Sequence, residues 1–179
     1  KSGEAINHFC DPVSALLRVE VKAGRNIINL DDDDGSDPYV EVVLVQPDGT
    51  EHKQQTHYID DATDPEWNRT FNFIAAKPYS SELIFRVYDY DGATSYDDLI
   101  GEVKIPISKL KLHTGIGQAP EREWHTLLDA KGKDADAEGT KYGDLQIRAY
   151  LDEEYFEHLH GGNTSKAVGR LTVDVLEGI

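Results

Sequence analysis

Aspartate residues crowd two short segments of this chain, and carboxylates at this density indicate a bound cation. The first segment runs from Asp31 to Asp37 and the second from Asp89 to Asp98. Each segment follows a stretch typical of a β-strand, so each is expected to form a loop. Two carboxylates in close contact repel by roughly 4 kcal/mol at an effective dielectric constant of about 20, so a fold that gathers several of them needs a compensating cation. Oxygen ligands on flexible loops suit calcium, whereas magnesium demands a stricter octahedron and zinc prefers nitrogen and sulfur.

Two other interpretations of the first segment were weighed against a cation site. The run from Asp31 to Asp34 alone is equally expected in a solvated loop that binds nothing, and it is the second acidic segment that favours a cation site. An EF-hand calcium loop fails, because its frame places Leu30 at the first position, where a carboxylate is required.

Composition narrows the classes of protein to which the chain can belong. The 179 residues carry a net charge of −16, from 18 basic and 34 acidic side chains. This charge disfavours nucleic acid as a partner, because nucleic-acid binding needs a basic surface. No apolar run reaches the length of a membrane span, and no nucleophile or phosphate-binding motif suggests an enzyme. The single cysteine, Cys10, indicates a reducing compartment, so a cytoplasmic location is expected. The polar first residues and the absence of methionine predict a fragment of a longer protein.

Alternation of apolar and polar residues predicts an all-β fold with eight short strands. The expected strands, separated by turn signals, begin near Leu16, Tyr39, Gln54, Trp67, Leu83, Val103, Trp124 and Leu145. Two packed antiparallel sheets are the natural way to bury the apolar faces of such strands. The strand from Gln54 is expected to reach Ile59, and a short helical turn is expected within Ser108 to His113.

Four domain segments are expected along the chain. They are an N-terminal extension over 1–15, a main domain over 16–155, a linker over 156–168 and a final segment over 169–179. The linker is indicated by its glycine-rich composition. Leu171, Val173 and Val175 in the last segment repeat the alternation of the first strand, which indicates the start of a second copy of the domain. The alternative is a ninth strand of the same domain.

Four motifs, in order along the chain, resemble the C2 domain, the calcium- and lipid-binding β-sandwich of synaptotagmins, protein kinases C and ferlins. The matching segments are Ser36-Asp37-Pro38-Tyr39-Val40, Asp64-Pro65-Glu66-Trp67-Asn68, Val87-Tyr88-Asp89-Tyr90-Asp91 and Asp98-Leu99-Ile100-Gly101-Glu102. The resemblance extends over most of the chain, from about Leu16 to about Tyr155. One residue departs from the family pattern, since Asp64 stands where the second motif has asparagine.

The resemblance implies a set of calcium ligands on two loops. The family's bridging aspartates fall on Asp31 and Asp37 in the first loop, and on Asp89, Asp91 and one of Asp97 or Asp98 in the third. The step of six residues from Asp91 favours Asp97, whereas counting back from Gly101 favours Asp98, so both stay candidates. The backbone carbonyls of Asp32 and Tyr90 are expected to contribute further ligands.

The resemblance also predicts a strand order and a function. A permuted, phospholipase-like order is favoured, with Gly143 to Ile147 as part of the closing strand; in the synaptotagmin-like order this segment would open the next copy. The implied function is calcium-dependent attachment of the parent protein to anionic phospholipids, chiefly phosphatidylserine, and the domain would lie at the membrane only when calcium is bound. A calcium-independent module that binds another protein is the alternative. Phosphoinositide recognition is not expected, because the family's lysine cluster is missing and only Lys53 lies in that region.

Overall fold

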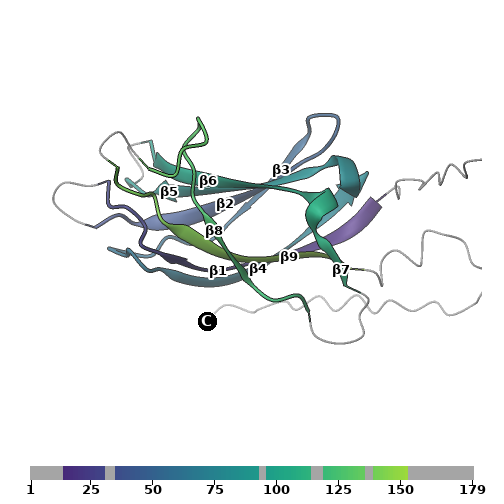
Figure 1. The fold of residues 1–179 in the computed structure, drawn as a ribbon, viewed down its shortest axis with the longest axis horizontal. Helices are drawn as coiled ribbons and strands as arrows, with labels where there is room; N and C mark the ends of the chain where they lie inside the picture. The colour runs from purple at the N-terminus through teal and green to yellow at the C-terminus, as the bar shows by residue number, and fades with distance from the viewer. Residues whose placement is uncertain (1–13, 31–34, 93–95, 114–118, 136–138, 153–179) are drawn as a thin grey trace, which may run out of the picture.

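A computed structural model describes residues 14–30, 35–92, 96–113, 119–135 and 139–152, which fold into a β-sandwich (Figure 1). Short 3-10 helices, η1 and η2, cover Pro78–Ser80 and Ile107–Lys109. Within the described residues, no helix is long and apolar enough to span a membrane. The strands are β1 (Ser14–Arg25), β2 (Pro38–Val45), β3 (Glu51–Gln55), β4 (Glu66–Ala76), β5 (Glu82–Asp89), β6 (Asp98–Pro106), β7 (Lys111–His113), β8 (Glu123–Thr126) and β9 (Asp144–Asp152).

The strands form two sheets in the predicted all-β arrangement. One sheet has the order β4-β1-β9-β7, with β8 also paired to β9, and the other has the order β3-β2-β5-β6. All pairs of strands are antiparallel except β7 and β9, which run parallel. The eight expected strands are therefore present, and β7 is an additional strand of three residues.

The closing strand lies beside the first one, as the permuted order predicts. β9 pairs with β1 from Leu16 and Asp152 at one end to Arg25 and Asp144 at the other. β9 therefore occupies the position next to β1 in the sheet.

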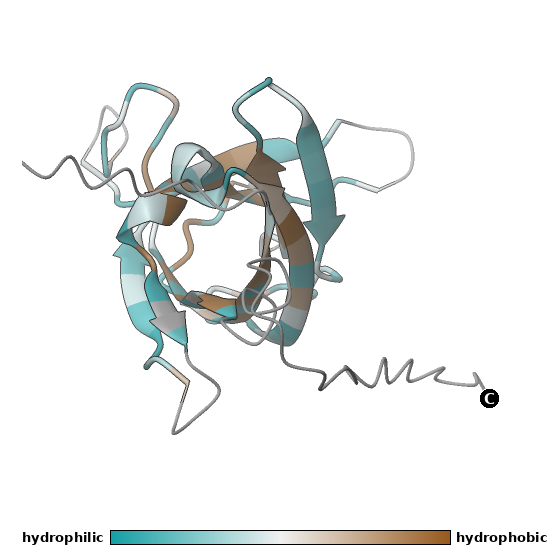
Figure 2. Cartoon of the chain, turned by 90° about the vertical axis from the view of Figure 1, so that its right-hand side faces the viewer, coloured by the Kyte–Doolittle hydropathy of each residue, from teal (hydrophilic) through white to brown (hydrophobic). Residues whose placement is uncertain are grey.

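The apolar faces of the two sheets meet in one core. Leu17, Val19 and Val21 on β1 are buried, and the residues between them are only partly covered. Phe71 and Phe73 on β4 and Phe85 on β5 join the same cluster. Figure 2 shows hydrophobic residues, in brown, as bands on the strands that surround the interior of the sandwich. Burial of such surface contributes about 25 cal/mol per Å² and explains why the alternating residues form strands in this register.

Several expected boundaries are wrong, and each has a physical reason. The polar strand was expected over Gln54–Ile59, but β3 spans Glu51–Gln55 with all five residues exposed. An edge strand that buries neither face carries no alternation, so its position cannot be found from hydrophobicity. The expected helical turn is limited to Ile107–Lys109, and the chain then extends into β7 to pair with β9.

Candidate metal centre

The strand ends bring the acidic segments to one end of the sandwich, at the left of Figure 1. Asp37 immediately precedes β2, Asp89 ends β5 and Asp98 begins β6. Pro38 pairs with Asp89, and Asp89 pairs with Asp98, across the neighbouring antiparallel strands. The register of three strands therefore places carboxylates from distant parts of the sequence side by side.

Asp89 lies at the centre of this group and is only 1% exposed. One of its carboxylate oxygens, Oδ1, accepts a hydrogen bond of 2.7 Å from the backbone N–H of Asp37. The other, Oδ2, is buried and has no hydrogen-bond partner among the described residues. A buried carboxylate oxygen without a donor is costly, so this atom indicates a place for a ligand that supplies positive charge.

The carboxylate of Asp91 experiences the negative charge of its neighbours. Loss of hydration, followed by the charges of Asp89, Asp98 and Asp97 in that order, raises the pKa of Asp91 above its ordinary value. Like charges disfavour ionisation of a carboxyl group, so the neighbouring carboxylates repel one another at this end of the fold.

Asp97 and Asp98 differ in their surroundings. The hydroxyl of Tyr39 donates a 2.7 Å hydrogen bond to Asp97 Oδ2, and the backbone N–H of Asp91 donates one of 3.3 Å to Asp97 Oδ1. Burial and the hydrogen bond to Asp97 raise the pKa of Tyr39, which is therefore protonated and a donor at neutral pH. The side chain of Asp98 is exposed, and its charge acts on Asp91 more strongly than that of Asp97.

The loop between β3 and β4, which contains Asp61, supports Asp37. The backbone N–H of Asp61 donates to Asp37 Oδ1 at 2.9 Å, and Asp61 Oδ1 accepts from the N–H of Gly35 at 3.1 Å. A side chain at position 35 would bring a Cβ within 3.0 Å of the Cα of Asp61. Glycine thus allows the close approach of the two loops, and a larger residue would need a small shift of the backbone at Asp61.

The turn that contains Trp67 fixes the strand leaving the first loop. The buried indole of Trp67 donates a 3.1 Å hydrogen bond to the carbonyl oxygen of Pro38. On the other side, the backbone N–H of Gly24 donates to the carbonyl of Pro65 at 2.9 Å. The motif from Asp64 to Asn68 thus holds both ends of the first loop.

At this end of the molecule, sequence analysis missed contacts between separate loops. The ring of Tyr58 stacks on that of Tyr90, with centroids 4.4 Å apart. Tyr96 is 97% exposed, and Leu30 and Leu99 are also exposed beside the acidic residues. No spacing rule links Tyr58 to Tyr90 or Tyr39 to Asp97, because both contacts depend on the packing of separate loops.

The described part of the site is incomplete. Asp31 and Asp32 lie outside the described residues, and within the described ranges no group of three or more histidine, cysteine, aspartate or glutamate side chains is arranged to hold a metal ion. The donor chemistry nevertheless fits a hard cation, because the unpaired oxygen of Asp89 lies among further carboxylates. Tyr90 contributes its N–H to the carbonyl of Asp37 at 3.2 Å, which keeps the two loops together.

The outward face of the β3-β2-β5-β6 sheet carries alternating charges. Arg86 lies opposite Glu41 on one side and Glu102 on the other, at 3.1 and 3.7 Å. Lys53 contacts Glu41 at 3.6 Å and Glu51 at 3.4 Å, and Lys104 pairs with Glu102, so three basic side chains face three acidic ones. Every basic group in this row has an acidic partner, so the row carries no surplus of positive charge for an anionic headgroup.

Comparison with known proteins assigns the family. The sequence model of the C2 domain matches residues 15–127. The chain belongs to the C2 domain family. Human synaptotagmin-2 is 35% identical over 133 residues, which cover 72% of this chain and 28% of that protein. The rat E3 ubiquitin-protein ligase NEDD4 is 33% identical over 106 residues, covering 59% of this chain and 12% of the ligase. This C2 chain thus corresponds to a small part of each relative.

Solved structures support the same fold. A single C2 domain of plant Extended Synaptotagmin 1 superposes with a TM-score of 0.64 at 20% identity, covering 79% of this chain and 95% of that domain. The calcium-bound pair of C2 domains from Extended-Synaptotagmin 2 gives a TM-score of 0.56 at 20% identity, covering 78% of this chain and 46% of that structure. These similarities establish the C2 sandwich.

Proposed function

We propose that this C2 domain binds calcium between its first and third loops and thereby attaches its parent protein to anionic phospholipids. The observation that carries the proposal is the buried Oδ2 of Asp89, which has no donor among the described residues and lies among other carboxylates. The proposed ligands are the side chains of Asp31, Asp37, Asp89, Asp91 and one or both of Asp97 and Asp98, with the backbone carbonyls of Asp32 and Tyr90.

The chain's own contacts prepare the loops for the ion. The backbone N–H of Asp37 donates a hydrogen bond to one oxygen of Asp89. The backbone N–H of Asp61, in the neighbouring loop, donates one to the side chain of Asp37 and so orients it. Tyr39 holds Asp97, which leaves the exposed Asp98 as the preferred proposed ligand of the two. Calcium, when bound, would supply positive charge that can be shared with the phosphate and carboxylate groups of phosphatidylserine.

Charge and exposure favour weak, salt-sensitive attachment by one isolated domain. Two bound ions would change the net charge from −16 to about −12, so the potential would be reversed only near the loops. Tyr96 and Leu99 are exposed there and suit the interface between headgroups and acyl chains. The alternating charges around Arg86 offer no second basic site for the membrane. Within this proposal, the domain is a cytoplasmic, non-catalytic module that is peripheral to the membrane.

Sedimentation with liposomes tests this function. Vesicles with and without phosphatidylserine are compared in calcium and in chelator, at low and at physiological salt. Binding is expected only with phosphatidylserine and calcium, and it should weaken with salt because exposed charges are screened within about 8 Å at physiological ionic strength. A second C2 copy beginning near Gly169, as the sequence predicts, would raise the avidity of the longer protein. Tight binding to neutral vesicles in chelator would contradict the proposed mechanism.

The acidic charge favours one alternative, a calcium-independent module that binds a basic protein. Capture of such a partner to the same extent in calcium and in chelator, together with absent lipid binding, would support this alternative.

A further inference from the structure

A cavity of about 300 Å³ lies between the end of β6 and the middle of β9, and a gap in the strand pairing produces it. One edge of β9 pairs with β1. The other edge carries β8 beside Asp144–Ile147 and β7 beside Tyr150–Asp152. Arg148 and Ala149 lie between these two short partners and line the cavity. Among the described residues, no strand pairs with this edge of β9 at these two positions.

The cavity is locally basic in an acidic protein. Its lining includes four basic side chains, from Lys104, Lys109, Lys111 and Arg148, against two acidic ones, from Glu121 and Glu123. Within the lining the balance is +2, four minus two, although Lys104 and Arg148 also pair with Glu102 and Glu20 outside it; the whole chain carries −16. A concave basic site inside a negative surface concentrates anions.

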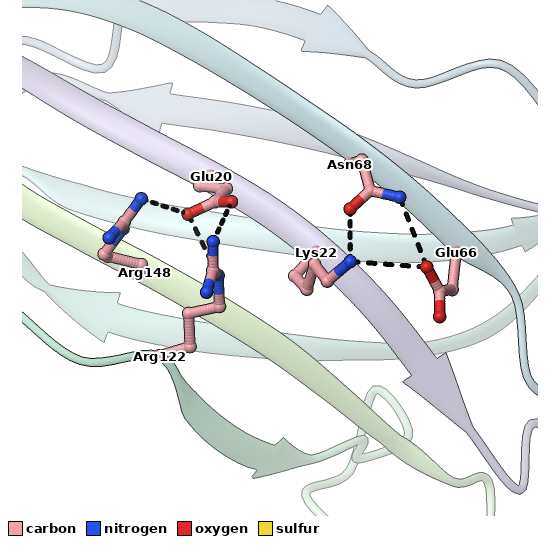
Figure 3. A network of polar contacts seen from close by, with 6 residues as sticks. All are labelled: Glu20, Lys22, Glu66, Asn68, Arg122 and Arg148. Atoms are coloured by element: carbon pink, nitrogen blue, oxygen red, sulfur yellow. Dashed lines mark hydrogen bonds and ion pairs between the residues drawn. The ribbon is translucent and has the colours of Figure 1, made fainter.

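The basic groups are incompletely neutralised. Lys109 has no ion pair among the described residues, and Lys111 lies 4.0 Å from Glu123, at the limit of an ion pair. Arg148 directs Nη2 to Glu20 at 2.7 Å (Figure 3), yet its Nε is buried without a hydrogen-bond partner in the described part of the chain. The guanidinium of Arg148 is thus committed to Glu20 on the outer face of the sheet, and the cations left for an anion are Lys109 and Lys111.

Apolar side chains complete the lining. Ile105, Leu110 and Ala149 line the cavity and also pack against the hydrophobic core, so its floor is firmly held. A volume of about 300 Å³ is at the lower end of ligand-binding cavities, which limits the occupant to a small molecule or group.

We propose that this cavity binds the phosphate monoester of a small soluble molecule, with the phosphate near Lys109 and Lys111 and the apolar body on the floor. A phosphate monoester carries a charge of about −1.5 to −2 at neutral pH and offers three acceptor oxygens, which suits several separate cations. A carboxylate carries a single charge and is satisfied by one arginine fork.

A soluble ligand is favoured over a lipid headgroup by the position of the cavity. η2 and β7, which border it, lie towards the end of the sandwich opposite the acidic loops (Figure 1). A membrane reached by those loops would leave the cavity facing solution. The preference for a soluble ligand over a lipid headgroup rests on the proposed function, whereas the cavity itself does not.

Titration with phenyl phosphate in calcium-free, phosphate-free buffer tests the proposal. Saturable binding is expected, with shifts of the backbone NMR signals of Lys109 and Ala149, and phenol should not bind. Lys109→Glu should weaken binding at least tenfold. Lys131→Glu, an exposed residue outside the cavity with the same change of charge, should leave it unchanged. Because calcium is absent, failure here is separate from failure of the metal site.

Three results would overturn the proposal. The first is no saturable binding by the wild-type chain, and the second is an equal loss in the Lys131→Glu control. The third is binding only to vesicles that contain phosphatidylinositol phosphate, or only to a phosphorylated peptide, which would assign the cavity to a lipid or a protein. Circular dichroism and thermal melts of each variant establish that the fold is retained.

Discussion

The backbone N–H of Asp37 donates a hydrogen bond of 2.7 Å to the buried carboxylate of Asp89, although 52 residues separate them in sequence. This contact joins the loop before β2 to the end of β5 through the chain's own groups. The loops are therefore aligned without an ion, and a cation would add to an existing fold rather than create it. The core between the sheets does not depend on these loops.

Calcium is expected to raise the melting temperature without being required for folding. Binding to the folded state alone stabilises it by about 2.7 kcal/mol at a hundredfold excess of calcium over Kd. Asp91→Asn should remove most of this gain, because that carboxylate lies among three others. Asp134→Asn is the control, since it removes an exposed carboxylate paired with Lys141 at 3.1 Å outside the site. Calorimetric melts in calcium and in chelator give the comparison, and identical melts of the wild type would refute calcium binding.

The two adjacent aspartates should contribute unequally to calcium binding. Asp98→Asn is expected to weaken binding about tenfold or more, roughly the 1.4 kcal/mol of one decade. Asp97→Asn should weaken it less, because the oxygens of Asp97 already accept from Tyr39 and Asp91. Isothermal titration calorimetry of both variants checks the order. A larger loss for Asp97→Asn would show that the exposed residue is not the main ligand.

Removal of the Tyr39 hydroxyl should lower stability modestly. Tyr39→Phe leaves Asp97 Oδ2 without its donor, and loss of a hydrogen bond to a charged group costs about 1.5–3 kcal/mol, less where water can replace the donor. Tyr88→Phe is a matched control, because its ring stacks on Tyr39 with centroids 5.5 Å apart and that contact survives. Urea unfolding of both variants measures the difference, and equal losses would mean that the hydroxyl contributes nothing.

Replacement of each of the two tryptophans by phenylalanine should lower stability by very different amounts. Trp67→Phe removes a buried donor to the carbonyl of Pro38 and leaves a cavity, so a loss of about 2–4 kcal/mol is expected. Trp124→Phe should cost only about 0.5–1 kcal/mol, because Trp124 is exposed and contacts the guanidinium of Arg25. Urea unfolding followed by circular dichroism measures both. Comparable losses would contradict the role assigned to Trp67.

An ion cluster on the outer face of the β4-β1-β9 sheet should make stability depend on pH (Figure 3). Burial alone would raise the pKa of Glu20, but hydrogen bonds and charge from Arg122 and Arg148 outweigh it and lower the pKa below 4.5. A depressed carboxyl pKa stabilises the fold above the unfolded value, and this gain is lost as the pH falls below about 4.5. Glu20→Gln should therefore destabilise the protein by about 1–2 kcal/mol at pH 7 and by less near pH 3.

Urea unfolding at both pH values tests this dependence. Glu121→Gln, an exposed residue near Arg122, is the control and should show little effect at either pH. A Glu20→Gln penalty that stays constant between pH 7 and pH 3 would exclude the ion cluster as its cause.

Alternating strands and local motifs were predictable because their signals are local. β1 and β9 bury mainly alternate residues and β5 buries most of its residues, so Leu17, Phe85 and Leu145 indicate the strands. The aspartates at the ends of β5 and β6 could be assigned to one site through the family resemblance, and the structure describes five of the expected aspartate ligands at one end of the fold.

Features that depend on contact between distant segments were not predictable. β3 has no buried face, and β7 exists because β9 offers an open edge to three residues. The bond from Tyr39 to Asp97 joins residues 58 apart, and no periodicity encodes it. The charge row around Arg86 likewise requires the register of three strands. Such features belong to tertiary packing rather than to local propensity.

The pairing of Leu16 with Asp152 has a mechanical consequence. The chain enters the sandwich through β1 and leaves through its antiparallel neighbour β9 at the same end, where Arg18 contacts Asp152 at 2.6 Å. Tension applied to these two points would separate β1 from β9 like a zipper, because hydrogen bonds perpendicular to the strands then break in succession rather than together. In a longer polypeptide under tension, the pairing between β1 and β9 would break first. The separation would begin at the end farthest from the acidic loops.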